Sequence, residues 1–160
     1  DLDICSVYRK LSSKMMNEIM EDIRLAVISD RKAFTGYMES RNVLRYVFKN
    51  KDKKKIYLFT TDQRPYFNGP DHMTVNFMNR PCLTMSASAG VAKKFGMAVV
   101  YQRMLERKGG YDIEYIPICK DASKMSVEEM IDRYYKLLEE DLRIQPFNYL
   151  WTHNRWWLMN

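Results

Sequence analysis

Asp62 and Gln63 are the residues of this chain whose types and position best suit chemistry. They follow IYLFTT at 56–61, an apolar run typical of a buried strand, and a loop with Arg64 and Pro65 comes next. In α/β proteins ligands bind beyond the carboxyl ends of strands, so a carboxylate and an amide placed there are expected to meet a substrate. The alternative is that the strand belongs to a packed β-α-β unit with no active site.

The small-residue segment SASAGVAKKFG, which begins at Ser86, is expected to form the next helix. Thr84, Ser86 and Ser88 lie around its start and Gly96 lies at its end, which predicts caps at both ends. Its amino terminus would then suit an anionic group. A strand, MAVVYQRM at 97–104, completes the predicted order of strand, loop, helix and strand.

His72 and His153 are the two imidazoles that could act as general bases. The sequence contains no glycine-rich phosphate loop, no GxSxG turn, no HExxH and no EF-hand spacing that would give either one a partner. His72 follows Gly-Pro-Asp and is expected in a loop. His153 lies among aromatic residues beside Arg155, which favours a structural histidine, hydrogen-bonded in or beside a core, over a catalytic one.

Composition restricts the classes of protein that fit. With 160 residues and 46% hydrophobic content, the chain is expected to form a single α/β domain over 1–160. A formal net charge of +6 favours anionic partners such as phosphates, nucleic acid or a membrane face. Cys5, Cys82 and Cys119 have no CxxC spacing, which argues against a disulfide framework and a thiolate metal site and favours a reducing compartment. No apolar run approaches the roughly 20 residues of a membrane helix.

The amino-terminal part predicts alternating strands and helices. DICSVY at 3–8 is typical of a strand, and apolar residues recur at helical spacing over 14–27, after the candidate cap residues Ser12 and Ser13. The methionines of that helix suit core packing better than the alternative, the lining of an acyl channel.

Three shorter segments follow in the sequence. A short strand is expected at 26–29 and a helix at 37–48. The run KNKDKKK at 49–55 predicts a solvated loop, with membrane-surface contact as the alternative.

The carboxyl-terminal part predicts a hairpin and a long helix. Gly109-Gly110 would supply the turn between two alternating strands, the second ending near Pro117. Ser126 and Glu129 have the spacing of a capping box, and Gln145-Pro146 would end the helix that follows. The apolar stripe of this helix is formed by Val127, Met130, Ile131, Tyr134, Leu138 and Leu142.

Five segments in order resemble the later half of the bacterial lipid A biosynthesis acyltransferases: VYRKL at 7–11, LFTTDQRP at 58–65, and the stretches at 76–100, 109–118 and 146–157. The resemblance implies a glycerolphosphate-acyltransferase-like α/β fold, a mixed β-sheet flanked by helices. It implies transfer of a lauroyl or myristoyl chain from acyl carrier protein or acyl-CoA to a lipid A precursor or related anionic glycolipid. This lipopolysaccharide chemistry would take place at the cytoplasmic face of the inner membrane, without a cofactor.

The chain departs from the family pattern in three ways. Asn79 stands where a Gly is usual, although Asn tolerates the same left-handed backbone. The proline that often follows the paired valines is missing. The catalytic signature, a His followed after four residues by Asp or Glu, is also missing, because Phe77 lies at that offset from His72 and Leu158 from His153.

The missing signature implies a truncated piece without the general base, inactive by itself. The chain starts with Asp1 rather than Met, and we expect an anchor helix and the His motif upstream of VYRKL in the complete gene. A cut sheet would also leave the strand at 3–8 with an open edge or an uncovered apolar face and favour self-association.

The resemblance implies roles for individual residues. Asp62 would partner the absent His, and Arg9 would hold a phosphate or stabilise an oxyanion, which makes both catalytic. Substrate-binding roles are implied for Gln63, Arg80, His153 and Arg155, and no metal site is implied.

Two alternatives remain open at this point. Arg80 and Arg155 would equally suit loop anchors that donate hydrogen bonds to main-chain carbonyls. The whole chain could instead be a non-catalytic module that binds an anionic membrane lipid or a nucleic acid, since positive charge with interleaved aromatic residues is also a nucleic-acid signature. Against nucleic acid, the sequence has neither an RNP-like nor a helix-turn-helix pattern, so no nucleic-acid partner is expected.

Overall fold

The computed structural model describes residues 3–26, 34–63, 65, 72–153 and 155–156. The chain divides into two compact units, Asp1–Thr60 and Thr61–Asn160, called here the first and the second unit and each described by itself. The single domain expected over 1–160 stays a prediction. Within the described ranges, no helix combines the length and the apolar character that crossing a membrane requires.

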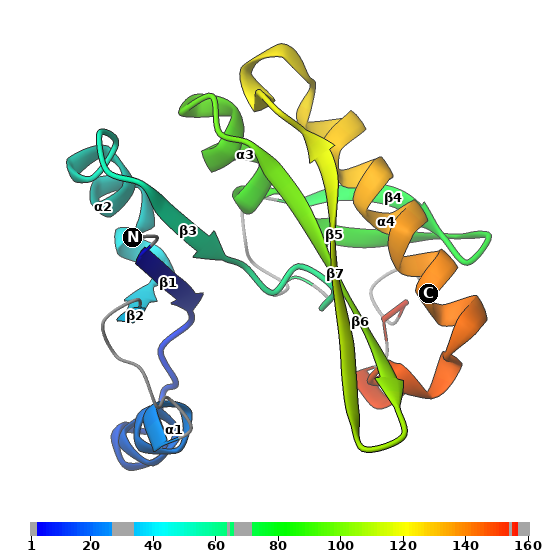
Figure 1. The fold of residues 1–160 in the computed structure, drawn as a ribbon, viewed down its shortest axis with the longest axis horizontal. Coiled ribbons are helices and arrows are strands. Elements are labelled where there is room, and N and C mark those ends of the chain that lie inside the picture. The colour runs from blue at the N-terminus through cyan, green and yellow to red at the C-terminus, as the bar shows by residue number, and fades with distance from the viewer. Residues whose placement is uncertain (1–2, 27–33, 64, 66–71, 154, 157–160) are drawn as a thin grey trace. The chain divides into compact units, whose positions relative to one another are not determined.

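The first unit holds a three-stranded parallel sheet in the order β2-β1-β3 (Figure 1). Its strands are β1 (Asp3–Tyr8), β2 (Phe34–Glu39) and β3 (Lys55–Leu58). Cys5 of β1 pairs with Gly36 on one side and with Tyr57 on the other. The strand expected at 3–8 is therefore confirmed, but it is the centre of this sheet and both its edges are paired, so the open edge was wrong. The other form of that expectation, an uncovered apolar face, stays a prediction.

Two helices connect these strands. α1 (Lys14–Ala26) begins after Ser13, whose Oγ accepts a hydrogen bond from the Met16 N–H at 3.3 Å. α2 (Val43–Lys49) follows a 3₁₀ turn at Ser40–Asn42. The helix expected from Tyr37 begins later, because β2 continues to Glu39. The strand expected at 26–29 is not seen at Ala26, which ends α1, and its other residues lie outside the described ranges.

β3 differs from the buried strand that was expected to lead into Asp62. It ends at Leu58, and its side chains alternate between half-buried and exposed, with Ile56 and Leu58 on the exposed side. Phe59, Thr60 and Thr61 have no regular secondary structure. Asp62 is thus carried by an irregular segment and does not follow directly from a strand.

The second unit opens with a hairpin of β4 (His72–Phe77) and β5 (Arg80–Met85). Met78 and Asn79 form its two-residue turn with φ of 54° and 59°. Two positive φ angles are what a type I′ turn requires, because its twist matches that of the strands. The left-handed Asn79 is confirmed, whereas the loop expected for His72 was wrong, because His72 begins β4.

α3 (Ala87–Lys94) ends in a Schellman motif. The Met97 N–H donates to the Ala92 carbonyl at 3.0 Å and the Gly96 N–H to the Lys93 carbonyl at 3.3 Å, with Gly96 at φ 60°. The expected cap at Gly96 is confirmed. At the other end Ser86 occupies the N-cap position, but its side chain makes no capping hydrogen bond, so that part of the prediction was wrong.

A second hairpin consists of β6 (Val99–Arg107) and β7 (Gly110–Cys119). Gly109 lies in the turn at φ 86°, as expected, but Gly110 already begins β7 and pairs with Arg107, so the turn is Lys108-Gly109 and not Gly109-Gly110. β7 runs two residues beyond Pro117. β6 pairs with β7, while β5 pairs with β4. Because the strands on either side of α3 lie in different sheets, the β-α-β alternative is wrong for the described residues.

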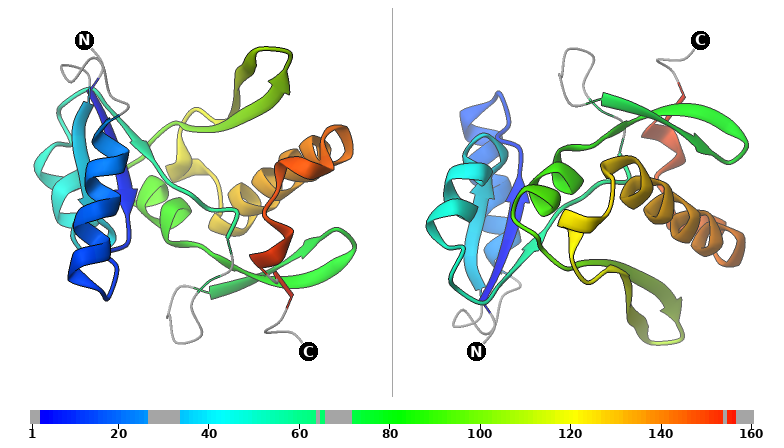
Figure 2. Two further views of the ribbon diagram at one scale, coloured as in Figure 1. Left: turned by 90° about the horizontal axis from the view of Figure 1, so that it is seen from below. Right: turned by 90° about the horizontal axis from the view of Figure 1, so that it is seen from above.

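α4 (Val127–Ile144) lies between the two hairpins of the second unit (Figure 2). The Glu129 N–H donates to Ser126 Oγ at 3.0 Å, which confirms the expected cap, and Gln145 ends the helix. Short 3₁₀ turns follow at Pro146–Asn148 and Trp151–His153.

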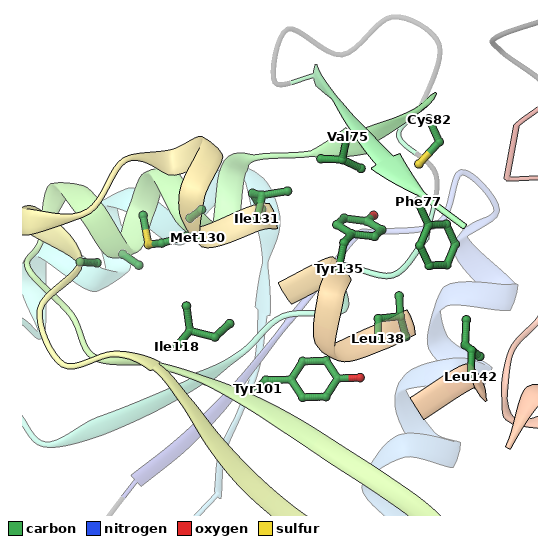
Figure 3. Close-up of a cluster of buried hydrophobic side chains, with 13 residues drawn as sticks. Val75, Phe77, Cys82, Tyr101, Ile118, Met130, Ile131, Tyr135, Leu138 and Leu142 are labelled. Atoms are coloured by element: carbon green, nitrogen blue, oxygen red, sulfur yellow. The ribbon is translucent and has the colours of Figure 1, made fainter. Parts of the chain in front are cut away.

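The core of the second unit packs the buried face of α4 against both hairpins and α3 (Figure 3). Tyr135 lies in the centre of this face, where the sequence predicted its neighbour Tyr134. The buried residues of the cluster are Val75, Phe77, Cys82, Ala89, Ala92, Tyr101, Ile118, Ala122, Met130, Ile131, Tyr135, Leu138 and Leu142. The mixed α/β class is thus confirmed.

Candidate functional site

The segment that carries Asp62 is held by two tyrosine hydroxyl groups. The Tyr135 hydroxyl donates to the main-chain carbonyl of Thr61 at 3.4 Å, and the Tyr149 hydroxyl donates to that of Asp62 at 3.0 Å. Asp62 itself is half-buried and Gln63 is exposed. The carboxylate of Asp62 makes no hydrogen bond to another described residue. Its main chain is therefore fixed while its carboxylate is left for other partners.

Tyr135 is the centre of a buried polar cluster. Its side chain is 1% exposed, and its hydroxyl lies 2.7 Å from Thr84 Oγ1 and accepts a hydrogen bond from Arg155 Nη2. The ring of Tyr135 also lies under the guanidinium of Arg155, whose Cζ is 5.3 Å from the ring centroid. Tyr135, which lies on α4, thus connects β5, the segment of Asp62 and the carboxyl-terminal segment.

Arg155 is a buried cation, with 3% of its surface exposed. Besides Nη2, which bonds Tyr135, its Nε and Nη1 have no hydrogen-bond partner in the part of the chain that the structure describes. Burial raises the pKa of the neighbouring Cys82 thiol, against the opposing positive charge of Arg155. The side-chain contact to Tyr135 takes the place of the main-chain anchor that the sequence suggested as an alternative.

The tyrosines around Asp62 stay protonated at neutral pH. Burial raises the pKa of Tyr135 to about 12, although the Arg155 charge opposes the shift. Burial likewise raises the pKa of Tyr134 and of Tyr149, and the negative charge of Asp62 adds to both shifts. Neutral phenols can donate hydrogen bonds, so the two contacts to the carbonyl groups persist across the physiological range.

The other predicted site residues have different surroundings. Arg80 is exposed at the start of β5, and its guanidinium carbon lies 5.4 Å from the centroid of the Trp156 ring. His153 ends a 3₁₀ turn, but its side chain lies outside what the structure describes. Arg9 belongs to the first unit, where it is exposed just after β1. Within the second unit, the structure brings together the Asp62 segment and Arg155, with Tyr135 between them.

Tyr135, Tyr149 and Thr84 were not recognised as site residues from the sequence. The apolar stripe of α4 runs through Ile131, Tyr135 and Leu138 at helical spacing, so a closer count of that period would have placed Tyr135 inside. Its hydrogen bonds join residues 20, 51 and 74 positions apart, and no local pattern reports such pairs.

A second polar cluster links β6 to α4. The Tyr101 hydroxyl donates to Asp141 Oδ2 at 2.6 Å, and Arg103 bonds the other oxygen of the same carboxylate. Arg103 also contacts Glu114 and Glu140. Each charge here faces an opposite charge, which is typical of a structural network.

An open groove of about 240 Å³ lies between β7 and α4. Its lining is formed by Ile116, Pro117, Ile118, Arg133, Lys136 and Leu137. The two cations at its rim are paired within α4, Arg133 with Glu129 at 2.9 Å and Lys136 with Asp132 at 2.7 Å. Among the described residues, no group of three or more His, Cys, Asp or Glu side chains is placed to hold a metal ion.

The model of the bacterial lipid A biosynthesis acyltransferase family matches residues 5–157. The chain belongs to this family. The match spans all five segments on which the resemblance was based. A comparison with curated proteins found no match. Membership of the lipid A acyltransferase family gives an acyltransferase-related function, with an acyl donor and a lipid acceptor in general terms.

Proposed function

We propose that this chain is the substrate-binding and scaffolding part of an enzyme that transfers a fatty acyl chain to a lipid A precursor or related anionic glycolipid. The fatty acyl group would be delivered as a thioester of acyl carrier protein or of coenzyme A. The transfer would take place at the cytoplasmic face of the bacterial inner membrane, with no further cofactor. The observation that carries the proposal is the placement of Asp62. Its main chain is hydrogen-bonded to Tyr149, while its carboxylate makes no hydrogen bond to another described residue.

The chemistry of such a transfer assigns Asp62 an electrostatic role. A general base takes the proton of the acceptor hydroxyl, whose oxygen attacks the thioester carbonyl carbon. The carbon–sulfur bond then breaks and the thiol leaves with a proton. When the base is a histidine, a neighbouring carboxylate stabilises the imidazolium that forms. Asp62 would be that carboxylate, and Arg9 would hold a phosphate or stabilise the oxyanion.

The histidine of the His-(four residues)-Asp/Glu signature is not among these 160 residues. We therefore propose that the chain does not turn over alone and forms the later part of a glycerolphosphate-acyltransferase-like fold. Exposed Gln63 and Arg80 are suited to polar and anionic groups of the substrates, and His153 would contribute from the closing segment. Arg155 differs from Gln63 and Arg80 because it is buried.

The test is Asp62→Asn in the enzyme encoded by the complete open reading frame. We expect turnover to fall roughly 100-fold or more, the usual contribution of an acid–base partner, with the melting temperature nearly unchanged. The matched control is Asp112→Asn, the same change at an exposed carboxylate of β7 that pairs with Arg107. A fully active but less stable Asp62→Asn enzyme would show that Asp62 is a loop cap and contradict the proposal.

A further inference from the structure

The hydroxyl of Tyr135 has as many partners as it can hold. A phenol offers one proton and two lone pairs. The Thr61 carbonyl can only accept and the Arg155 guanidinium can only donate, so Tyr135 gives its proton to Thr61 and takes one from Arg155. The remaining lone pair faces Thr84 Oγ1 at 2.7 Å, which makes the threonine hydroxyl the donor. The three hydrogen bonds thus run in one direction, from Thr84 and Arg155 to the Tyr135 hydroxyl and from that hydroxyl to the Thr61 carbonyl.

This arrangement lies in the interior of the second unit. Thr84 is 0% exposed, and Tyr135 and Arg155 are nearly as buried. A hydrogen bond donated by a cation to a phenol oxygen withdraws charge from it and makes the phenol proton a stronger donor. Arg155 therefore strengthens the contact of Tyr135 with Thr61, and its own burial keeps it away from a ligand.

The segment that accepts these hydrogen bonds, Thr61 and Asp62, is not held by hydrogen bonds of a helix or a strand. Thr61 and Asp62 belong to no helix or strand, and consecutive carbonyls of the two residues point at Tyr135 and Tyr149. Two adjacent carbonyls held from the interior restrict the backbone on either side of Asp62. The direction of the Asp62 side chain then follows from the backbone.

We propose that Tyr135, Tyr149 and Arg155 are positioning residues that orient the Asp62–Gln63 segment from inside the core, with Arg155 acting through Tyr135 rather than on a substrate. The involvement of Asp62 in the reaction rests on the proposed function; the positioning of its backbone does not.

The first experiment measures positioning in the chain itself by carbonyl ¹³C and amide ¹⁵N NMR. Tyr135→Phe keeps the ring and should shift the Thr61 carbonyl signal, whereas Tyr149→Phe should shift that of Asp62. Both should lower the order parameters of the 62–63 amides from about 0.85 toward 0.6. Thr84→Val removes one donor to Tyr135 without changing side-chain size, and it should shift the Thr61 signal less than Tyr135→Phe does. It replaces Tyr135→Phe as the test variant if Tyr135→Phe is poorly folded.

Tyr101→Phe is the matched control, because it removes a hydroxyl from the same core whose partner is Asp141. It should leave the 61–63 signals unchanged. If Tyr135→Phe and Tyr149→Phe lower stability as Tyr101→Phe does but leave the carbonyl shifts and order parameters of 61–63 unchanged, the positioning proposal is overturned.

The second experiment uses the complete enzyme. Tyr135→Phe and Arg155→Lys should each lower kcat about 10-fold with little change in KM, as expected for a misplaced catalytic group. In an Asp62→Asn background the same substitutions should cost no further activity, because they act through Asp62. Equal losses in both backgrounds would overturn the coupling. If Asp62→Asn alone is fully active while the NMR changes remain, the proposed function fails and the positioning stands.

Discussion

The two units of this chain differ in how their apolar residues are used. Among the described residues, the first unit buries only Cys5, Val43 and Val47 as apolar side chains, while the second has a continuous core of 13 buried residues. On α1, Met15 and Ile23 remain 66% and 57% exposed. Amphipathic spacing thus predicted the helix itself in both units, but it did not predict how deeply the apolar face would be buried.

The difference has an energetic consequence. Burial of apolar surface is the main favourable term in folding. Truncating an apolar side chain of the same type should therefore lower the free energy of unfolding far more in the second unit than in the first. The parallel sheet of the first unit has little buried apolar support among the described residues. Parallel sheets are normally covered on both faces, which makes its low burial the more unusual.

Phe77 and Phe48 offer the largest test of this comparison. Phe77 is buried and its ring centroid lies 5.2, 6.0 and 5.7 Å from those of Tyr135, Tyr149 and Trp156, while Phe48 on α2 is 61% exposed. Phe77→Ala should lower the free energy of unfolding by about 3–5 kcal/mol. Phe48→Ala should lower it by less than about 1 kcal/mol.

Urea denaturation followed by circular dichroism measures both variants. Similar losses for the two would show that the first unit has a core as demanding as that of the second, and the contrast between the units would not stand.

Alkaline pH should weaken the second unit through its buried tyrosines. Burial raises the pKa of Tyr135 to about 12 and also raises those of Tyr101 and Tyr134. An unfolded tyrosine titrates near pH 10, so the unfolded state loses protons first and stability falls as pH rises from about 10 to 12. Each such group contributes a slope of about 1.4 kcal/mol per pH unit in that window.

Denaturation curves between about pH 8 and 11 measure this slope, since stability is fully present below the unfolded pKa near 10. Tyr135→Phe should reduce the slope by the share of one group. A stability that stays level up to about pH 11 would mean that the tyrosines ionise in the folded state as easily as in the unfolded chain.

The smallest expected effect compares one N-cap in each unit. Ser126 Oγ accepts from Glu129 at 3.0 Å and Ser13 Oγ accepts from Met16 at 3.3 Å. Either serine changed to Ala should cost about 1 kcal/mol of helix stability. In α4 the loss should lower the melting temperature, because α4 forms the core, whereas in α1 it should appear as faster amide exchange in the first turn.

Aspartate keeps an acceptor at the cap, so Ser126→Asp and Ser13→Asp are the controls and should behave like the unchanged chain. A drop in melting temperature as large for Ser13→Ala as for Ser126→Ala would indicate that α1 contributes to the cooperative core.

Sequence reasoning succeeded where one local signal fixed one element. The helical period and the Ser126 cap gave α4, and Gly109 gave the second hairpin. It failed where signals overlapped or were missing. β2 was missed because the helical pattern that begins at Tyr37 overlaps its last residues, and the first hairpin was missed because its turn is Met78-Asn79, without the Gly that usually marks such turns.

For the candidate site, too, the sequence pointed to a residue with a local signal and missed contacts that depend on the tertiary fold. Asp62 was singled out by its place after an apolar run, and this role stays a prediction even though β3 ends before it. The contacts of Tyr135 with Arg155 and Thr84 come from three separate elements brought together by packing. Single-sequence patterns report neighbours along a helix or strand, and such contacts depend on the tertiary fold.

The strand order β2-β1-β3 also sets an order of events during synthesis. β1 is made before β2 and β3, yet it becomes the central strand and pairs with β3, where Asp3 forms an ion pair with Lys55, 52 residues later. Closing so long a loop is slow, whereas a hairpin such as β6–β7 forms within about 1–10 μs once both strands are made. We expect the β6–β7 hairpin to close almost as it emerges, whereas β1 waits for β3 before its second edge is paired.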